Sequence, residues 1–207
     1  MNITLILLLV TVGLSMLAFS NPAVLDRMIF NPYRINRDRE WYRFITSGFI
    51  HADWLHLLVN GFVLYSFGPI VEQFYDFNFG ELSGFYFIAL YFGAMVISIA
   101  RSYKKHLNDP RYNALGASGA VSAVVFSFIL FNPLHQLCLY GILCLPGILF
   151  GAGYLFYCYR MARVRRDNIN HDAHLWGALY GFFFTIAMKP TLLLDFFSKL
   201  IYFRHAF

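Results

Sequence analysis

The sequence predicts an all-α integral membrane protein with six transmembrane helices, formed as one domain over residues 1–207. Hydrophobic residues make up 59% of the chain and charged residues only 13%, and the mean hydropathy is +0.56. A soluble domain of this length needs a larger polar surface. The longest polar stretch, 21–43, is too short to bury a core of its own, so no separate soluble domain is expected.

Six apolar stretches approach the roughly 20 residues that a helix needs to cross a bilayer. They are 3–19, 54–75, 81–100, 118–130, 145–159 and 173–188. The fourth and fifth are short, so we expect them to start below the membrane surface. Helices are predicted because a backbone in hydrocarbon must satisfy its own hydrogen bonds, and the alternation of barrel strands is absent.

The first stretch ends in Ala18, Phe19 and Ser20, a pattern that is also typical of a signal-peptidase site. Secretory signals usually begin with basic residues, and none precedes this stretch. We therefore predict a retained helix.

Charge and cysteine placement argue against a nucleic-acid partner and against a disulfide framework or cysteine metal site. The net charge of +5 is spread over loops, without the basic and aromatic pattern of a nucleic-acid binder. Arginine and lysine gather in loops one, three and five, which the positive-inside rule places in the cytoplasm. Cys138, Cys144 and Cys158 lie in or beside apolar stretches without CxxC spacing, so they are predicted to be small buried hydrophobes with no disulfide or metal.

Three groups of residues suggest chemistry within the membrane. His56 and Asn60 are four residues apart and share one helical face, where they can act as two donors for an oxyanion or only bond neighbouring helices. Ser118 stands between Gly116 and Gly119, a sequence that also suits close helix packing. The polar stretch 104–115 runs into Ser118 and offers a route for water.

His174 begins a stripe that continues with Gly177 and Gly181. Small residues let another helix approach closely. If that helix begins at Ser118, the imidazole comes within reach of the hydroxyl as a general base. A purely structural histidine is the alternative.

Taken together, these motifs resemble the rhomboid family of intramembrane serine proteases over most of the chain. The matching motifs, in the order of the family, are Trp41-x-Arg43, His56-x-x-x-Asn60, Gly116-x-Ser118-Gly119 and His174-x-x-Gly177-x-x-x-Gly181. The resemblance implies a six-transmembrane-helix rhomboid-like bundle. It also implies that Trp41 and Arg43 anchor loop one.

The resemblance further implies a serine endopeptidase with a Ser118/His174 dyad and an acyl-enzyme intermediate, without a third acid or a cofactor. The residues expected to hold the oxyanion or border the substrate are His56, Asn60, Gly116 and His51. Expected partners are transmembrane protein substrates that present a small residue at the cut, and membrane lipid. The expected location is a bacterial cytoplasmic (inner) membrane, as a multi-pass protein.

Two features depart from the family pattern. Ser122 stands where many members carry a tyrosine that packs on the catalytic imidazole, and the sequence does not identify a replacement. The loop charges predict termini outside the cytoplasm, whereas family members usually have them inside, the orientation that we prefer.

Several alternatives remain beside the protease. Asp172 is two residues from His174, roughly 200° around the helix, so it is expected to cap the helix and not to join a triad. His51, His56, His171 and His174 lack the motif or carboxylates of a metal enzyme. A non-catalytic rhomboid-like protein that binds transmembrane helices is the main alternative, and a transporter would show repeats that we do not find.

Overall fold

The computed structural model describes residues 2–139, 143–164, 167 and 169–202. Its helices are α1 (Ile3–Ser20), α2 (Pro22–Met28), α3 (Pro32–Asp38), α4 (Arg43–Thr46), α5 (Trp54–Phe79), α6 (Ser83–Lys105), α7 (Ser118–Phe131), α8 (Gly147–Val164), α9 (His171–Met188) and α10 (Thr191–Tyr202), with 3₁₀ turns η1 (Ser47–Phe49) and η2 (Gly80–Leu82) and strands β1 (Gln136–Leu139) and β2 (Leu143–Pro146). Arg165 and Arg166, which contribute to the positive charge of loop five, lie outside the described residues.

Each of the six predicted stretches contains a helix, and the structure adds three features. α8 is longer than predicted, and it begins only after β2. Loop one is folded into the short helices α2, α3 and α4. A further helix, α10, follows α9 at an angle of 112°, because Pro190 lies at the break and proline cannot continue a helix.

Length and apolarity identify fewer spans than six among the described residues. Two stretches meet both criteria, Ile3–Ser20 and Trp54–Lys105, and the second contains both α5 and α6. The bent pair α9 and α10 provides a third if it is counted as one span. The six-span count therefore stays a prediction, although helices lie where it places them.

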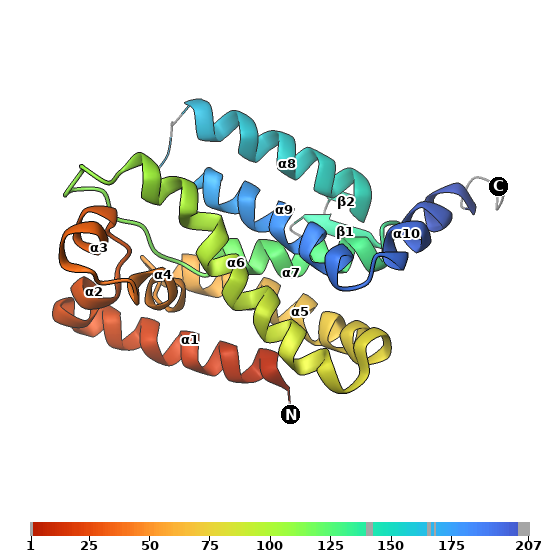
Figure 1. Ribbon diagram of the computed structural model, residues 1–207, viewed down its shortest axis with the longest axis horizontal. Helices are drawn as coiled ribbons and strands as arrows, with labels where there is room; N and C mark the ends of the chain where they lie inside the picture. The colour runs from red at the N-terminus through yellow and green to blue at the C-terminus, as the bar shows by residue number, and fades with distance from the viewer. Residues whose placement is uncertain (1, 140–142, 165–166, 168, 203–207) are drawn as a thin grey trace.

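The core is built around α7, which contacts α5, α6, α8, α9 and α10. Figure 1 shows α6 crossing in front of α7, with α9 beside them and α1 and α8 on the outer sides of the bundle. Every residue of α7 after Ser118 is buried. A helix that is apolar on all faces must be enclosed by others, which explains why this 14-residue helix is stable although it is short.

Buried polar contacts join the helices. Thr185 of α9 bonds both the Tyr75 hydroxyl of α5 at 2.8 Å and the Ser127 hydroxyl of α7 at 2.9 Å. At the other side, the carboxylate of Glu72 accepts the N–H groups of Ile3 and Thr4 at 2.9 and 2.7 Å. A carboxylate beside free N–H groups at a helix N-terminus is favourable, so Glu72 fixes the start of α1 against α5.

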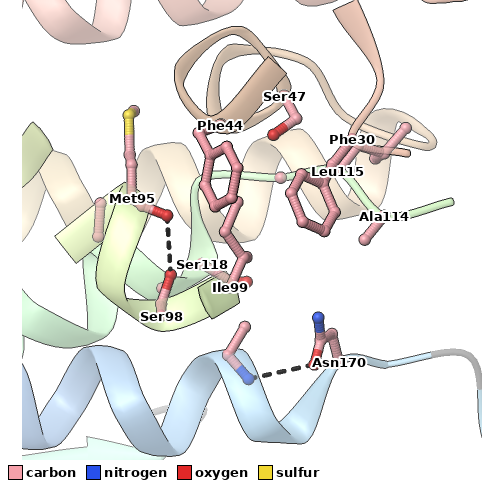
Figure 2. Close-up of a pocket in the computed structure, with 15 residues that line it drawn as sticks. Phe30, Phe44, Ser47, Met95, Ser98, Ile99, Ala114, Leu115, Ser118 and Asn170 are labelled. Atoms are coloured by element: carbon pink, nitrogen blue, oxygen red, sulfur yellow. Dashed lines mark hydrogen bonds between the residues drawn. The ribbon is translucent and has the colours of Figure 1, made fainter. Parts of the chain in front are cut away.

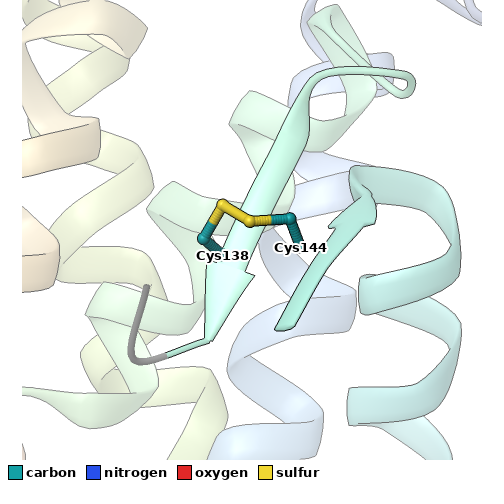
Figure 3. Close-up of a disulfide and its surroundings, with 2 residues drawn as sticks. All are labelled: Cys138 and Cys144. Carbon is teal, nitrogen blue, oxygen red and sulfur yellow. A yellow bond between two sulfur atoms is a disulfide. The ribbon is translucent and has the colours of Figure 1, made fainter. Parts of the chain in front are cut away.

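The prediction for two of the cysteines is wrong. β1 and β2 form an antiparallel hairpin in which Cys138 pairs with Cys144, and the two sulfur atoms form a disulfide (Figure 3). The sequence concealed this pair because hairpin register, and not CxxC spacing, brings the residues together. Cys158 is buried and free, as predicted.

The disulfide also bears on orientation. Disulfides persist in oxidising compartments, so the hairpin between α7 and α8 is expected outside the cytoplasm. The positive-inside rule places the same loop there. Both observations favour the orientation opposite to the usual family one.

Candidate active site

Ser118 is the first residue of α7 and is half-buried. Gly116 has a φ of +116°, a conformation that residues with a side chain rarely adopt. Its N–H donates to the Ser47 carbonyl at 2.9 Å, which holds the loop in front of α7. The first N–H groups of a helix have no carbonyl of their own helix to bond, so the Ser118 N–H is a suitable donor for an oxyanion.

The His56 ring packs directly against Gly116. A Cβ at Gly116 would lie 2.6 Å from Cε1 and 2.8 Å from Nε2 of His56, so only glycine leaves room for the imidazole. Asp53 caps α5 and accepts the His56 N–H at 2.8 Å. Asn60 is buried one turn further along and donates through Nδ2 to the His56 carbonyl at 2.9 Å. The two predicted donors thus share a helix, with His56 nearer to the loop before Ser118.

His51 links the first helix to that same loop. Its Nε2 accepts the Ala117 N–H at 3.4 Å, and its Nδ1 lies 3.0 Å from the Ser15 hydroxyl. Burial lowers the pKa of His51 to about 4, so the ring is neutral at pH 7. Its proton is therefore on Nδ1, which donates to Ser15, and Ser15 donates to the Phe49 carbonyl at 3.1 Å. His51 borders the His56 ring, with the ring centroids 4.8 Å apart.

The backbones of α7 and α9 touch beside the predicted dyad. A Cβ at Gly177 would meet the carbonyl group of Gly119, and a Cβ at Gly181 would meet that of Ala123. This is the close approach that the glycine spacing predicts, and it brings the first turns of the two helices together. Among the described residues, the Ser118 hydroxyl and His174 form no hydrogen bond with each other, and catalytic hydrogen bonds are often long without substrate.

Tyr154 of α8 supplies the aromatic contact for which the sequence showed no source. Its ring is stacked on His174, with centroids 6.3 Å apart and planes 9° from parallel. Its hydroxyl lies 2.9 Å from the Ser122 hydroxyl. Ser122 occupies the position where the family pattern has tyrosine, so here the aromatic ring comes from the neighbouring helix and the serine holds it. This contact depends on how α8 packs against α9, which the sequence pattern does not show.

A pocket opens beside Ser118. Its lining combines apolar side chains from loop one and α6 with the polar groups of Ser47, Ser98 and Asn170. Figure 2 shows Ser118 at its centre, with Leu115 and Ala114 of the preceding loop at one side. The pocket therefore adjoins the polar stretch that was predicted to bring water to the serine.

Arg43 organises loop one, as the motif implied. The side chain is fully buried and donates to the carbonyls of Asp26 and Ile29 at 2.6 and 2.7 Å and to the Glu40 carboxylate at 2.6 Å. A buried guanidinium requires such partners. Trp41 is half-exposed and packs near Tyr103 of α6, with ring centroids 5.7 Å apart.

The capping prediction for Asp172 is wrong. Asn170 is the N-cap of α9, and its side-chain oxygen accepts the Ala173 N–H at 3.1 Å. Asp172 lies in the first turn, where its charge suits the helix dipole, and pairs with Arg101 at 3.1 Å. The cap is decided by backbone geometry that the sequence pattern Asn-His-Asp leaves open.

Comparisons with known proteins agree with this arrangement. A rhomboid-domain family model matches residues 38–191. Rhomboid-like protein 11, chloroplastic, of Arabidopsis thaliana is 32% identical over 156 residues, which cover 68% of this chain and 50% of that protein. YdcA of Bacillus subtilis (strain 168), named as a candidate rhomboid protease, is 32% identical over 170 residues, which cover 80% and 78% of the two chains.

A third relative, RHOMBOID-like protein 12, mitochondrial, of Arabidopsis thaliana, is 30% identical over 165 residues. The match covers 74% of this chain and 49% of that protein. The chain thus spans about half the length of the two plant relatives. The region that the family model matches, residues 38–191, contains every predicted site residue.

Proposed function

From the premise that this chain belongs to the rhomboid family, we propose that it is an intramembrane serine endopeptidase that hydrolyses peptide bonds in or near transmembrane segments. The family is embedded in membranes and acts on membrane proteins. One observation carries the proposal: Ser118 begins α7, and His174 lies in the first turn of α9, where the two helix backbones touch.

The two side chains have complementary chemistry. His174 takes the hydroxyl proton as Ser118 Oγ attacks the substrate carbonyl, and the tetrahedral intermediate then collapses to an acyl-enzyme. His174 gives its proton to the departing amine. Water hydrolyses the ester and restores the free serine. Stacking on Tyr154 limits the rotation of the imidazole throughout these steps.

Donors near Ser118 supply the expected oxyanion site. The Ser118 N–H belongs to the first turn of α7, where N–H groups lack a partner in their own helix and negative charge is favoured. His56 adjoins Gly116, and Asn60 lies one turn away on α5. His51 positions the Ala117 peptide without itself needing to touch the substrate.

The pocket beside Ser118 has the features that a hydrolytic water requires. Water in an enclosed site needs several polar partners, and Ser47, Ser98 and Asn170 are among the residues that line the pocket. The proposed substrates are transmembrane segments with a small residue at the cut, as the resemblance to the family implies. The proposed setting is a bacterial cytoplasmic membrane, with lipid around the bundle.

A serine-reactive fluorophosphonate probe tests the mechanism on the full chain in detergent. We expect labelling of the peptide that contains Ser118, and loss of labelling in Ser118→Ala and His174→Ala. Ser66→Ala is a matched control because the hydroxyl of this half-buried serine donates to the Phe62 carbonyl of its own helix at 2.8 Å, and it should label as the wild type does. Asn60→Ala is expected to weaken cleavage of a transmembrane substrate while the protein stays folded.

The opposite outcomes are informative. A folded wild type that is not labelled, but that captures transmembrane helices in lipid nanodiscs, would support the non-catalytic alternative. Labelling that persists in Ser118→Ala would contradict the assignment of the nucleophile.

A further inference from the structure

Three potential metal ligands meet between α8 and α9. Sγ of Cys158 and one ring nitrogen each of His171 and His174 all lie within 4.8 Å of one another. His171 and His174 are one turn apart on α9, so they share a face, and Cys158 faces them from α8. The sequence predicted no metal site because the packing of α8, which adds the thiol, is not visible in the histidine pattern.

Within the described part of the chain, His171 has an unpartnered ring nitrogen in this buried region. The side chain is 4% exposed, and its Nε2 lies 3.1 Å from both carboxylate oxygens of Asp167. A carboxylate at Nε2 holds the proton on that nitrogen and leaves Nδ1 as an acceptor. Nδ1 has no hydrogen-bond partner among the described residues. An unpartnered buried polar atom costs free energy, and a bound ligand would supply the missing partner.

The Asp167–His171 contact also has the form of a support for metal binding. Histidines that bind metals usually donate their second ring N–H to a carboxylate, which fixes the ring and raises its basicity. Asp167 is partly exposed, so it also marks where the cluster meets solvent. Its negative charge offsets the positive end of α9, which otherwise disfavours a cation.

We propose that Cys158, His171 and His174 bind one Zn²⁺ or a similar thiophilic divalent cation. Thiolate and imidazole ligands in tetrahedral geometry favour this class of metal. Zinc bonds of about 2.0 to 2.3 Å place tetrahedral ligand atoms about 3.3 to 3.6 Å apart, so side-chain rotations that bring the three atoms together by about 1 Å complete the set. Cys158 releases its thiol proton to solvent as the thiolate binds.

The bound cation would switch the enzyme off. This consequence rests on the proposed function, because His174 is the proposed base and a metal on its lone pair prevents it from accepting the Ser118 proton. The metal thus competes directly with the catalytic proton transfer. The fourth tetrahedral position remains for water, as in sites with three protein ligands.

Cobalt(II) substitution tests binding without any need for activity. We expect Co²⁺ to give the visible bands of a tetrahedral site and a thiolate charge-transfer band in the near ultraviolet, at one metal per chain, both in wild type and in Ser118→Ala. Cys158→Ser should remove the charge-transfer band. His171→Gln and Asp167→Asn should each weaken binding by tenfold or more, whereas His135→Gln, a histidine outside the cluster, should bind as wild type does.

Inhibition is measured separately by fluorophosphonate labelling of Ser118. Zn²⁺ should slow labelling of the wild type, a chelator should restore it, and Cys158→Ser should label normally and resist Zn²⁺ by at least tenfold. The proposal is overturned by a wild type without the tetrahedral cobalt spectrum, or by a spectrum that neither Cys158→Ser nor His171→Gln changes. A cobalt spectrum in a protein that never labels would leave the metal site standing and count against the protease.

Discussion

Replacing Gly177 by alanine should separate the two helices that carry the dyad. The new Cβ would lie 2.8 Å from the carbonyl carbon and 2.9 Å from Cα of Gly119, where ordinary contact begins at 3.4 Å. Because the obstacle is backbone in the middle of the bundle, α9 must move away by about 0.5 Å or more, at a cost of roughly 1 to 3 kcal/mol in stability. A 1 Å misplacement can cost about 10²-fold in rate, so we expect at least a roughly tenfold slower reaction.

Two measurements on purified protein check this expectation. Thermal unfolding in detergent reports the stability loss, and the rate of fluorophosphonate labelling at Ser118 reports the alignment of the dyad. Gly153→Ala is the matched control, because a Cβ on this helical glycine of α8 meets nothing within 4 Å. If Gly177→Ala unfolded and reacted as the wild type does, the close contact of α7 and α9 would not position the site.

Three other perturbations have defined outcomes. Tyr154→Phe keeps the ring and should retain most activity. Tyr154→Leu loses ring stacking worth about 0.5 to 1.5 kcal/mol and should slow fluorophosphonate labelling of Ser118 several-fold. Equal labelling rates in the two variants would contradict a positioning role for Tyr154. His51, which faces His56 and Asp53, has a lowered pKa. The free energy of unfolding is therefore highest above the ordinary histidine pKa of 6.5, and it falls by about 3 kcal/mol as the pH drops toward 4. Unfolding midpoints of wild type and His51→Gln that fall equally between pH 7 and 4.5 would refute this. In intact bacterial cells, a membrane-impermeant maleimide should label Cys138 only after reduction, and labelling that requires lysis would instead place the hairpin in the cytoplasm.

Local sequence was sufficient for the helices and for the motif residues. A backbone in lipid has few choices other than helix, so each of the six stretches contains a helix, whereas the count of six spans stays a prediction. Glycine spacing was similarly informative, since Gly177 and Gly181 leave one face of α9 smooth wherever its partner lies. Gly116 was found by motif, and the structure adds its physical reason, a positive φ against the His56 ring.

Contacts that depend on how distant segments pack were not available from the sequence. The disulfide depends on hairpin register. The break before α10 had a local signal, Pro190, but the angle between α9 and α10 is set by their packing. The sequence predicts Asp172 as the N-cap of α9, whereas the structure has Asn170 there. Both residue types favour helix starts, and only the backbone conformation distinguishes them.

The membrane setting, the helical class and the resemblance to rhomboids follow from the chain alone, because composition, span length and residue spacing act locally. The surroundings of His174 follow from the packing of the helices. Tyr154 and Cys158 reach it from α8, and His171 reaches it from the preceding turn of α9. Side chains on different helices meet according to how those helices rotate and pack, and no pattern within a single helix specifies that rotation.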